Sequence, residues 1–339
     1  MLKNMSSPSS LPTVTALKTD PGLRGKAFTG VFLLQKQEVR TTKTNNPFRR
    51  LEFADRTGSF STNLFSDSPL YQAAEAIPEG AVCRIKGQWE AFNDMFSPRL
   101  SDLQEVAPGD VRRQNLLAQL VESCPENLES LYLELIDAVG EIQEPKLQAT
   151  VKSVLNDLGD DFKTSPAAVS MHHAYRGGLL EHTVHMVRAA RALFPVYPEV
   201  HHDLALAGII LHDIGKIAEY EGDLTYRRSR IGILQGHVVL GYRLVRKAGL
   251  QNHLSEDLLE RLEHIILSHQ GEMEWGAAAL AATPEAVFVS MVDNLDAKMG
   301  MVQRLLRQGG NQPFSDRHPG LGTSLLLTSV NPSGDENPS

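Results

Sequence analysis

The chain has 339 residues, a formal net charge of −8, 42% hydrophobic residues and 22% charged residues. This length allows two domains with separate cores, and the composition is ordinary for a globular protein. No apolar stretch approaches the roughly 20 residues of a membrane span, and the first residues lack the apolar segment of a secretion signal. We therefore expect a cytoplasmic protein with no membrane partner. Cys83 and Cys124 fall in separate predicted domains, which favours reduced thiols over a disulfide.

The N-terminal third predicts a small all-β domain. Residues 1–23 are rich in Ser, Pro and Thr, and we expect a flexible lead-in. Residues 24–107 then contain five segments with strand-like patterns and one helical segment, 68–77, between the third and fourth. The expected strands are 27–40, 48–55, 59–65, 81–92 and 98–106. Five short strands with a helix after the third is the order of an OB-fold barrel.

A domain of this kind binds single-stranded nucleic acid by stacking bases on aromatic rings while basic side chains follow the phosphates. Residues 24–107 hold 11 Lys and Arg against 10 Asp and Glu, near +1, so the acidic excess of the chain lies elsewhere. We expect Trp89 and Phe92 to stack on bases, and Arg49 and Lys86 to contact phosphates. Alternating Phe residues in a small barrel are mostly core, and we place Phe53 and Phe65 there.

After residue 107 the pattern becomes helical and predicts an all-α bundle. We expect a helical connector at 108–160, a catalytic helical domain at 161–307 and a mostly mobile tail at 308–339. Apolar periodicity predicts helices in five segments of the second region. These segments are 178–193, 203–214, 232–248, 256–268 and 284–306.

The helical region contains an ordered set of imidazole and carboxylate side chains. A His-Asp doublet closes the apolar run 209–211, where polar side chains are costly unless something binds them. The candidate metal ligands are His182, His212, Asp213, His237, His269 and Asp293. Mixed imidazole and carboxylate ligands suit Mn, Fe, Co, Ni or Zn better than Ca or Mg. Two alternatives stay open at this point, Asp296 in place of Asp293 and His264 in place of His269.

The ordered motifs HHAYRGGLLEHT at 172–183, LHDIGK at 211–216, GH at 236–237, HIILSHQGE at 264–272 and VDNLDAKM at 292–299 carry a resemblance. Together they resemble the HD-domain superfamily of metal phosphohydrolases. More specifically, residues 25–305 resemble the YhaM-type 3′-5′ exoribonucleases, which join an N-terminal OB-fold to a C-terminal HD domain.

The resemblance implies a primary metal set of His182, His212, Asp213 and Asp293. His237 and His269 match the extra histidines with which some members hold a second ion, so we expect two divalent ions, with Mn the leading candidate. Lys216 matches a lysine that contacts phosphate, and the resemblance leads us to expect a second histidine where this chain has Gln270. The predicted catalytic residues are Asp213, which bridges the ions and activates water, and Lys216.

The predicted reaction is metal-dependent 3′-5′ exonuclease hydrolysis of single-stranded RNA, with DNA as a further polymer, to nucleoside 5′-monophosphates. His173 and Arg176 are expected to contact the substrate, although a capping and packing loop explains them equally well. Two alternatives differ in class. One is an HD-type hydrolase of free nucleotides such as dNTPs or cyclic nucleotides, and the other is a nucleic-acid-binding protein with an inactive HD core. The sequence does not indicate an oligomeric state.

Overall fold

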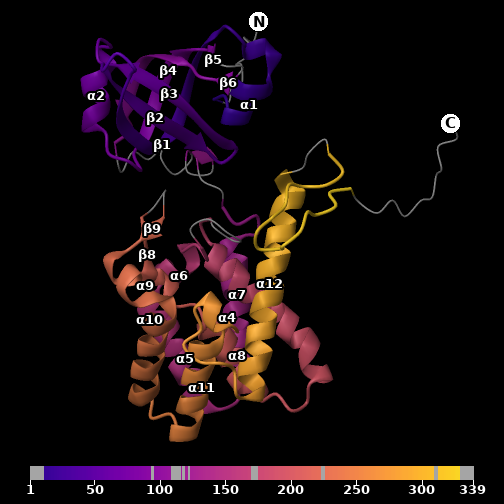
Figure 1. Ribbon diagram of the computed structural model, residues 1–339. Helices are drawn as coiled ribbons and strands as arrows, with labels where there is room; N and C mark the ends of the chain where they lie inside the picture. The colour runs from indigo at the N-terminus through magenta and orange to yellow at the C-terminus, as the bar shows by residue number, and fades with distance from the viewer. Residues whose placement is uncertain are drawn as a thin grey trace, which may run out of the picture. The chain divides into compact units, whose positions relative to one another are not determined.

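The computed structural model describes residues 11–92, 95–107, 116, 119–120, 123–168, 175–222, 226–308 and 312–328. The chain divides into two compact units (Figure 1). Unit 1 comprises residues 1–123 with 222–226, and unit 2 comprises residues 124–221 with 227–339. None of the described helices is long and apolar enough to cross a membrane.

Unit 1 is built on a five-stranded antiparallel sheet with the order β3-β2-β1-β4-β7. The long first strand serves both halves of this sheet, pairing with β4 over residues 27–33 and with β2 over residues 33–41. A short hairpin of β5 and β6 lies between β4 and β7 in the chain. The bounds are β1 Ala27–Thr41, β2 Pro47–Asp55, β3 Gly58–Phe65, α2 Leu70–Ala76, β4 Val82–Gln88, β5 Ala91–Phe92, β6 Met95–Phe96 and β7 Arg99–Glu105.

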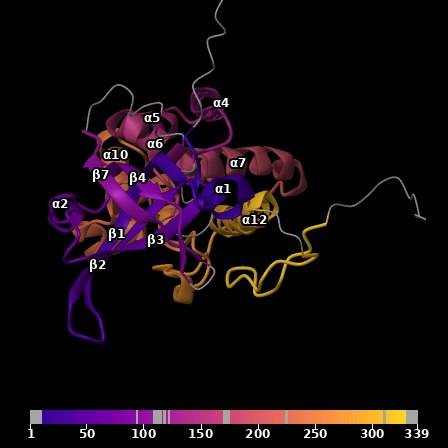
Figure 2. The same ribbon diagram turned by 90° about the horizontal axis from the view of Figure 1, so that it is seen from above.

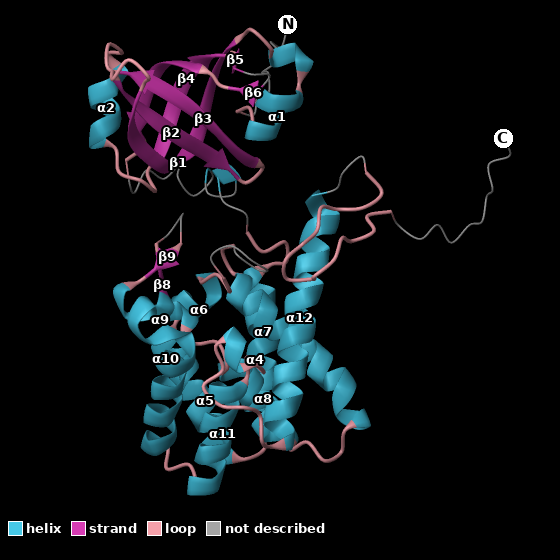
Figure 3. Cartoon of the chain, viewed as in Figure 1, coloured by secondary structure: helices cyan, strands magenta, loops and turns pink. Residues whose placement is uncertain are grey.

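The sheet curls so that its two edges approach each other (Figure 3). Thr62 on β3 donates a hydrogen bond to the carbonyl oxygen of Pro98, just before β7, at 2.5 Å. The concave side holds a core rich in phenylalanine, in which the rings of Phe32 and Phe60 meet edge to face with centroids 5.3 Å apart. The five expected strands and the helix after the third are therefore present, within a few residues of their predicted bounds.

The lead-in prediction is wrong for residues 11–23. This segment contains helix α1, Val14–Thr19, followed by a 3-10 turn η1, Pro21–Leu23. Val14 and Leu17 are 0% and 1% exposed and belong to the core of unit 1. Asp55 accepts the backbone N–H of Val14 at 2.7 Å, and the indole N–H of Trp89 donates to the carbonyl oxygen of Leu17 at 2.7 Å. Two apolar residues in a six-residue helix are too few to give a periodic signal.

Unit 2 is helical, with α8 at its centre (Figure 1). Helices α7 and α12 lie side by side in both views (Figures 1 and 2). Helix α8 packs against α4, α5, α7, α11 and α12, which gives it a buried environment on all sides. The helices are α4 Leu128–Glu141, α5 Pro145–Leu158, α6 Asp160–Thr164, α7 Gly178–Leu193, α8 His202–Leu211, α9 Lys216–Glu219, α10 Arg230–Gln251, α11 Glu256–Ser268 and α12 Pro284–Gln308. The 3-10 turns η2 Phe194–Val196 and η3 Met273–Trp275 and the short strands β8 Tyr220–Glu221 and β9 Arg227–Arg228 complete the unit.

The five helices predicted in this region are confirmed, and α7 and α11 have the predicted bounds. The expectation of a separate connector needs correction, because α4 and α5 contribute residues such as Leu135 and Val151 to the same core as α7 and α8. In the predicted tail, residues 312–328 form two isolated antiparallel bridges, Phe314 with Leu326 and His318 with Thr323.

Candidate metal centre

Helix α8 carries the His-Asp doublet at its C-terminal end. All residues from 204 to 211 are buried, so the C-terminal end of the helix lies in the interior of unit 2. His212 ends the helix, and Asp213 begins the turn that leads to α9. The two side chains are 0% and 2% exposed. A carboxylate at such a depth is stable only where it is paired or bound to a cation.

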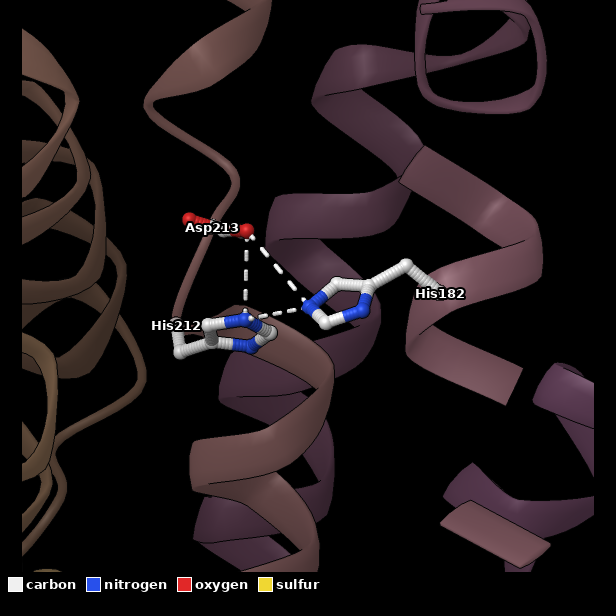
Figure 4. A group of neighbouring side chains, drawn as sticks. All are labelled: His182, His212 and Asp213. Atoms are coloured by element: carbon white, nitrogen blue, oxygen red, sulfur yellow. Dashed lines mark hydrogen bonds and ion pairs between the residues drawn. The ribbon is translucent and has the colours of Figure 1, made fainter. Parts of the chain in front are cut away.

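One group of donor atoms forms around Asp213 Oδ2 (Figure 4). His212 Nε2 lies 3.2 Å from this oxygen and 3.2 Å from His182 Nε2, which comes from α7. His182 Nε2 is 3.7 Å from Asp213 Oδ2. Asp293 on α12 adds its Oδ1 at 3.3 Å from His182 Nε2 and 4.0 Å from His212 Nε2. We call these four residues cluster 1.

A second group forms around the other oxygen of the same aspartate. His237 Nε2 on α10 and His269 Nε2 at the end of α11 each lie 3.5 Å from Asp213 Oδ1. We call Asp213, His237 and His269 cluster 2. The two oxygens of Asp213 therefore face different pairs of imidazoles, and Asp213 Oδ1 has no hydrogen-bond partner among the described residues although it is buried.

The hydrogen bonds behind the imidazoles fix where their lone pairs point. His212 Nδ1 is 2.8 Å from the carbonyl oxygen of Ile209, and His269 Nδ1 is 2.7 Å from that of Ile266. Since a carbonyl only accepts, both Nδ1 atoms carry the proton, and both Nε2 atoms present a lone pair when the rings are neutral. His237 Nδ1 is 2.9 Å from Glu219 Oε2, which gives it the same orientation. The sequence analysis missed Glu219. A carboxylate that follows the apolar residues Ile217 and Ala218, soon after the doublet, was the feature that could have indicated it.

Two glycines allow the approach of α10 to the doublet. Gly236 has φ +69° and breaks the helical backbone within α10, so the chain changes direction just before His237. Gly215 lies against that position, because a Cβ atom there would be 2.0 Å from the carbonyl oxygen of His237. Gly236 supplies the positive φ that turns the chain, and Gly215 leaves room for the backbone of His237.

The carboxylates of cluster 1 lie beside positively charged groups. Lys216 Nζ is 2.6 Å from Asp213 Oδ2 and is 7% exposed. Burial by itself raises the pKa of Asp213, but Lys216 and His212 outweigh it and hold that pKa well below its usual value. Burial also opposes the protonation of His182, yet hydrogen bonds to Asp293 and Asp296 raise its pKa to about 10. At neutral pH a protonated His182 and Lys216 therefore balance the carboxylates of cluster 1, and a cation bound there would replace the proton on His182.

The structure separates the alternatives that the sequence left open. Asp293 points at the Nε2 side of His182, whereas Asp296 Oδ2 lies behind the ring, 2.6 Å from Nδ1. His264 is directed elsewhere, since its Nε2 accepts the backbone N–H of Ala282 at 2.8 Å. Of the two candidates on α11, only His269 belongs to cluster 2.

A third group with metal-type donors, Glu126, Glu181 and His185, lies beside cluster 1. His185 Nε2 is 3.0 Å from Glu126 Oε1, and His185 Nδ1 is 3.3 Å from Asp296 Oδ1. Arg188 donates to both oxygens of Glu126 at 3.1 and 3.0 Å. Because this guanidinium already supplies the positive charge, we assign no cation to the third group.

The predicted substrate contacts are distributed unevenly. His173 and the side chain of Phe92 lie outside the described residues. Arg176 is half-buried, just before α7. Arg49 requires a correction, because it is 8% exposed, pairs with Glu75 at 2.9 Å and is therefore withdrawn from the surface. Arg49 shares a face of β2 with Leu51 and Phe53, so the alternation of this strand places it inward, and the prediction of a phosphate contact rested on its charge alone.

Lys86 and Trp89 belong to different surfaces of unit 1. Lys86 lies on the outside of β4 and pairs with Asp102 at 3.2 Å. Trp89 lines a cavity of about 720 Å³ that sequence reasoning missed. Lys18, Arg24 and Arg50 also line this cavity, and no carboxylate occurs among its described lining residues. The signal for Arg50 was present, since it alternates with buried Leu51 and must point outward.

An exposed aromatic pair lies near Arg50. The rings of Phe48 and Phe65 are 5.7 Å apart, and Phe65 is 49% exposed. The prediction of a core position is therefore wrong for Phe65, which occupies an outward-facing position at the end of β3. The prediction is confirmed for Phe53, which is 0% exposed.

Comparison with known proteins agrees with this geometry. The family model of the HD domain matches residues 179–298, which contain all six candidate ligands. The 3′-5′ exoribonuclease YhaM of Oceanobacillus iheyensis is 31% identical over 297 residues, covering 86% of this chain and 91% of the relative. The chain belongs to the YhaM family. The YhaM protein of a Geobacillus species is 30% identical over 85% of this chain and 87% of its own length. YhaM of Halalkalibacterium halodurans is 28% identical over 86% and 90%.

Membership of the YhaM family, together with the HD domain, identifies the chain as a hydrolase. Among solved structures, the aspartyl tRNA synthetase from Entamoeba histolytica aligns with 77% of this chain and 61% of its own. The TM-score is 0.25 and the identity 11%, too low to support an argument about fold or function.

Proposed function

We propose that this chain is a metal-dependent 3′-5′ exonuclease that hydrolyses single-stranded RNA to nucleoside 5′-monophosphates. The observation that carries the proposal is the pair of clusters that share the two oxygens of buried Asp213. The names of its YhaM relatives, 3′-5′ exoribonuclease, support the same reaction. One divalent cation per cluster would satisfy the converging donor atoms and the unpartnered oxygen of Asp213.

In this proposal His182, His212, Asp213 and Asp293 would hold one cation, and His237, His269 and Asp213 would hold the other. Bound cations would lower the pKa of an attacking water and neutralise charge on the phosphoryl oxygens. We favour Mn²⁺, with Fe, Co, Ni and Zn ions as the alternatives that suit the same donor atoms.

The charged side chains of the chain have separate roles in this proposal. Lys216 keeps Asp213 ionised through its 2.6 Å contact and adds positive charge beside the position of the phosphate. Asp296 and Glu219 hold the rings of His182 and His237 in the orientation that presents Nε2 to the clusters. His173 and Arg176 remain proposed contacts of the 3′-terminal nucleotide.

We further propose that residues 24–107 form an OB-type module that binds the single strand. The sheet order, the helix after the third strand and the contact between Thr62 and Pro98 support this architecture. The outer face of β2 and β3 offers the Phe48 and Phe65 pair for base stacking. The adjoining cavity offers Trp89 with the three cationic side chains, which suits an anionic strand.

A surface that binds a nucleic-acid strand also favours a polymer over free nucleotides as the substrate. A hydrolase of dNTPs or cyclic nucleotides has no need of an aromatic and cationic surface that extends beyond one nucleotide. We therefore propose a polymer substrate, with RNA as the favoured polymer and single-stranded DNA as a weaker one.

The test is digestion of 5′-labelled single-stranded RNA with Mn²⁺ by the full chain and by Asp213→Ala. Asp137→Ala, an exposed aspartate on α4, is the matched control. We expect a ladder that shortens from the 3′ end with the full chain and the control, and intact RNA with Asp213→Ala. Parallel reactions contain DNA, dNTPs and cyclic nucleotides. Intact RNA together with cleavage of the small nucleotides would replace the proposal with the free-nucleotide hydrolase. Bound Mn²⁺ without turnover of any substrate would indicate the inactive binding protein.

A further inference from the structure

The half-buried side chain of Gln270 enters cluster 2 directly. Its Nε2 atom lies 3.0 Å from His269 Nε2 and 3.2 Å from His237 Nε2. Helix α11 ends at Ser268, and the chain turns at Gly271, so Gln270 does not follow the helix away from the cluster. Three side chains thus direct a terminal atom at the same small volume beside Asp213 Oδ1.

The spacing of these atoms is that of ligands on one cation. With metal–ligand bonds of about 2.0–2.1 Å, neighbouring ligands are separated by roughly 2.8–3.4 Å in octahedral or tetrahedral geometry. The 3.5 Å distances from His237 and His269 to Asp213 Oδ1 lie just above this range. The contacts of Gln270 fall in this range, as do the 3.2 Å between His182 and His212 and the 3.3 Å between His182 and Asp293 in cluster 1. Gln270 therefore stands where a further ligand of cluster 2 belongs.

The chemistry of the amide fits two states of the cluster. Without a cation, the two N–H donors of the amide match the two lone pairs that His237 and His269 direct at it. An amide nitrogen does not bind a cation, but its oxygen does, and half a turn about the last side-chain bond exchanges the two atoms. The same position thus serves the cluster with and without an ion.

We propose that Gln270 is a ligand of the cation in cluster 2 through its amide oxygen. This inference rests on the two-cation arrangement of the proposed function. An amide oxygen is a neutral, hard ligand that binds first-row metals more weakly than an imidazole nitrogen. Cluster 2 therefore binds its cation more weakly than cluster 1, which has two imidazoles and two carboxylates. The two ions load in order, cluster 1 first, and the affinity of Gln270 for the second ion limits the loaded state.

The test is titration of the cation-free full chain with Mn²⁺ in the absence of RNA. Free Mn²⁺ is measured by its electron paramagnetic resonance signal, and spin coupling between the two bound ions reports the filled pair. We expect two ions with distinct affinities for the natural chain. Gln270→Ala should weaken the second ion at least tenfold and leave the first unchanged, since loss even of an outer partner costs 10–100-fold. Gln270→His should tighten the second ion. Gln251→Ala, an exposed glutamine on α10, is the control.

Three results would overturn the inference. The first is a single Mn²⁺ site in the natural chain. The second is an unchanged second affinity in Gln270→Ala, and the third is a tighter one, which would mean that the amide competes with the ion. Circular dichroism of each variant establishes that it is folded before titration. Because no RNA is present, a coupled Mn²⁺ pair that depends on Gln270 would stand even if the exonuclease assay failed.

Discussion

Replacement of Gly215 by alanine tests how closely the His-Asp turn and α10 must approach. Gly215 has φ −63° and ψ −20°, a conformation that alanine adopts freely. On backbone grounds alone, the substitution would stabilise the protein by about 0.4–1 kcal/mol. The added Cβ, however, would lie 2.0 Å from the carbonyl oxygen of His237 and 2.6 Å from the backbone nitrogen of Gly241. Steric overlap with backbone atoms should therefore make the substitution destabilising.

The size of the loss in stability follows from how far the backbone of His237 must move. An ordinary contact begins at 3.4 Å, so the His237 backbone must move away by about 1.4 Å, the difference between 3.4 and 2.0 Å. Overpacking of this kind costs about 1–3 kcal/mol, which leaves a net loss of roughly 0–2.6 kcal/mol after the backbone gain. At about 2–4 °C per kcal/mol, Tm falls by up to about 10 °C. Metal–ligand distances tolerate only about 0.2 Å, so the second Mn²⁺ ion should bind at least tenfold more weakly.

The assay is thermal unfolding without metal, followed by Mn²⁺ titration. Gly140→Ala on α4 is the matched control, because a Cβ at Gly140 meets nothing within 4 Å. The control should be as stable as the natural chain or more stable, by up to about 1 kcal/mol. A Gly215→Ala protein with the Tm and both Mn²⁺ affinities of the natural chain would refute the reasoning, since it would show that the two segments separate without consequence.

Five further substitutions test separate parts of the molecule. Glu219→Ala removes the acceptor behind one imidazole of cluster 2 and should weaken the second Mn²⁺ ion by about 10–100-fold in the same titration, with the first unchanged. Phe65→Ala should weaken binding of single-stranded RNA by about 1–3 kcal/mol in a fluorescence anisotropy assay. Arg50→Ala should weaken it and make it less dependent on salt, whereas Lys86→Ala should change it little. Arg188→Ala should lower Tm at pH 7 by roughly 1–8 °C, because it breaks two exposed pairs that contribute about 0.2–1 kcal/mol each. Arg188 lowers the pKa of the two glutamates that it binds, so its contribution is present above their unfolded pKa of about 4.5 and is lost as pH falls through their folded values. An equal Tm difference at pH 3 and pH 7 would contradict this cause.

The sequence predicts the helices of unit 2 well because their apolar faces are long and end at clear signals. Helix α11 has the predicted bounds, with an amphipathic face of buried leucine and isoleucine and acidic residues in its first turn. The choice between Asp293 and Asp296 could not be made in this way. The two residues are almost one helical turn apart, and only the position of His182 on another helix distinguishes its inner from its outer side.

The errors in unit 1 have a common physical origin. In β2, Arg49 lies two residues before Leu51 and four before Phe53, so alternation places it on the inward face, and only its charge suggested a surface contact. The buried position of Arg49 depends on Glu75 of α2, a contact between residues distant in sequence. Phe65 is at a strand end, where hydrophobicity alone does not indicate burial. In both cases the type of residue was given more weight than its position in the strand.

The position of the doublet explains why one aspartate can serve two clusters. Adjacent residues on a helix point about 100° apart, so His212 and Asp213 could not face one ion from the middle of α8. At the helix end, His212 still donates its backbone N–H to Gly208 at 2.8 Å, while Asp213 has left the helical path. Asp213 is thereby free to direct one oxygen at His212 and the other at His237 and His269. Burial of the whole helix then supplies the water-poor surroundings in which such a carboxylate requires positive charge on both sides. Lys216 meets this need beside Asp213 Oδ2, and in the proposed function a cation held with His237 and His269 would meet it beside Oδ1.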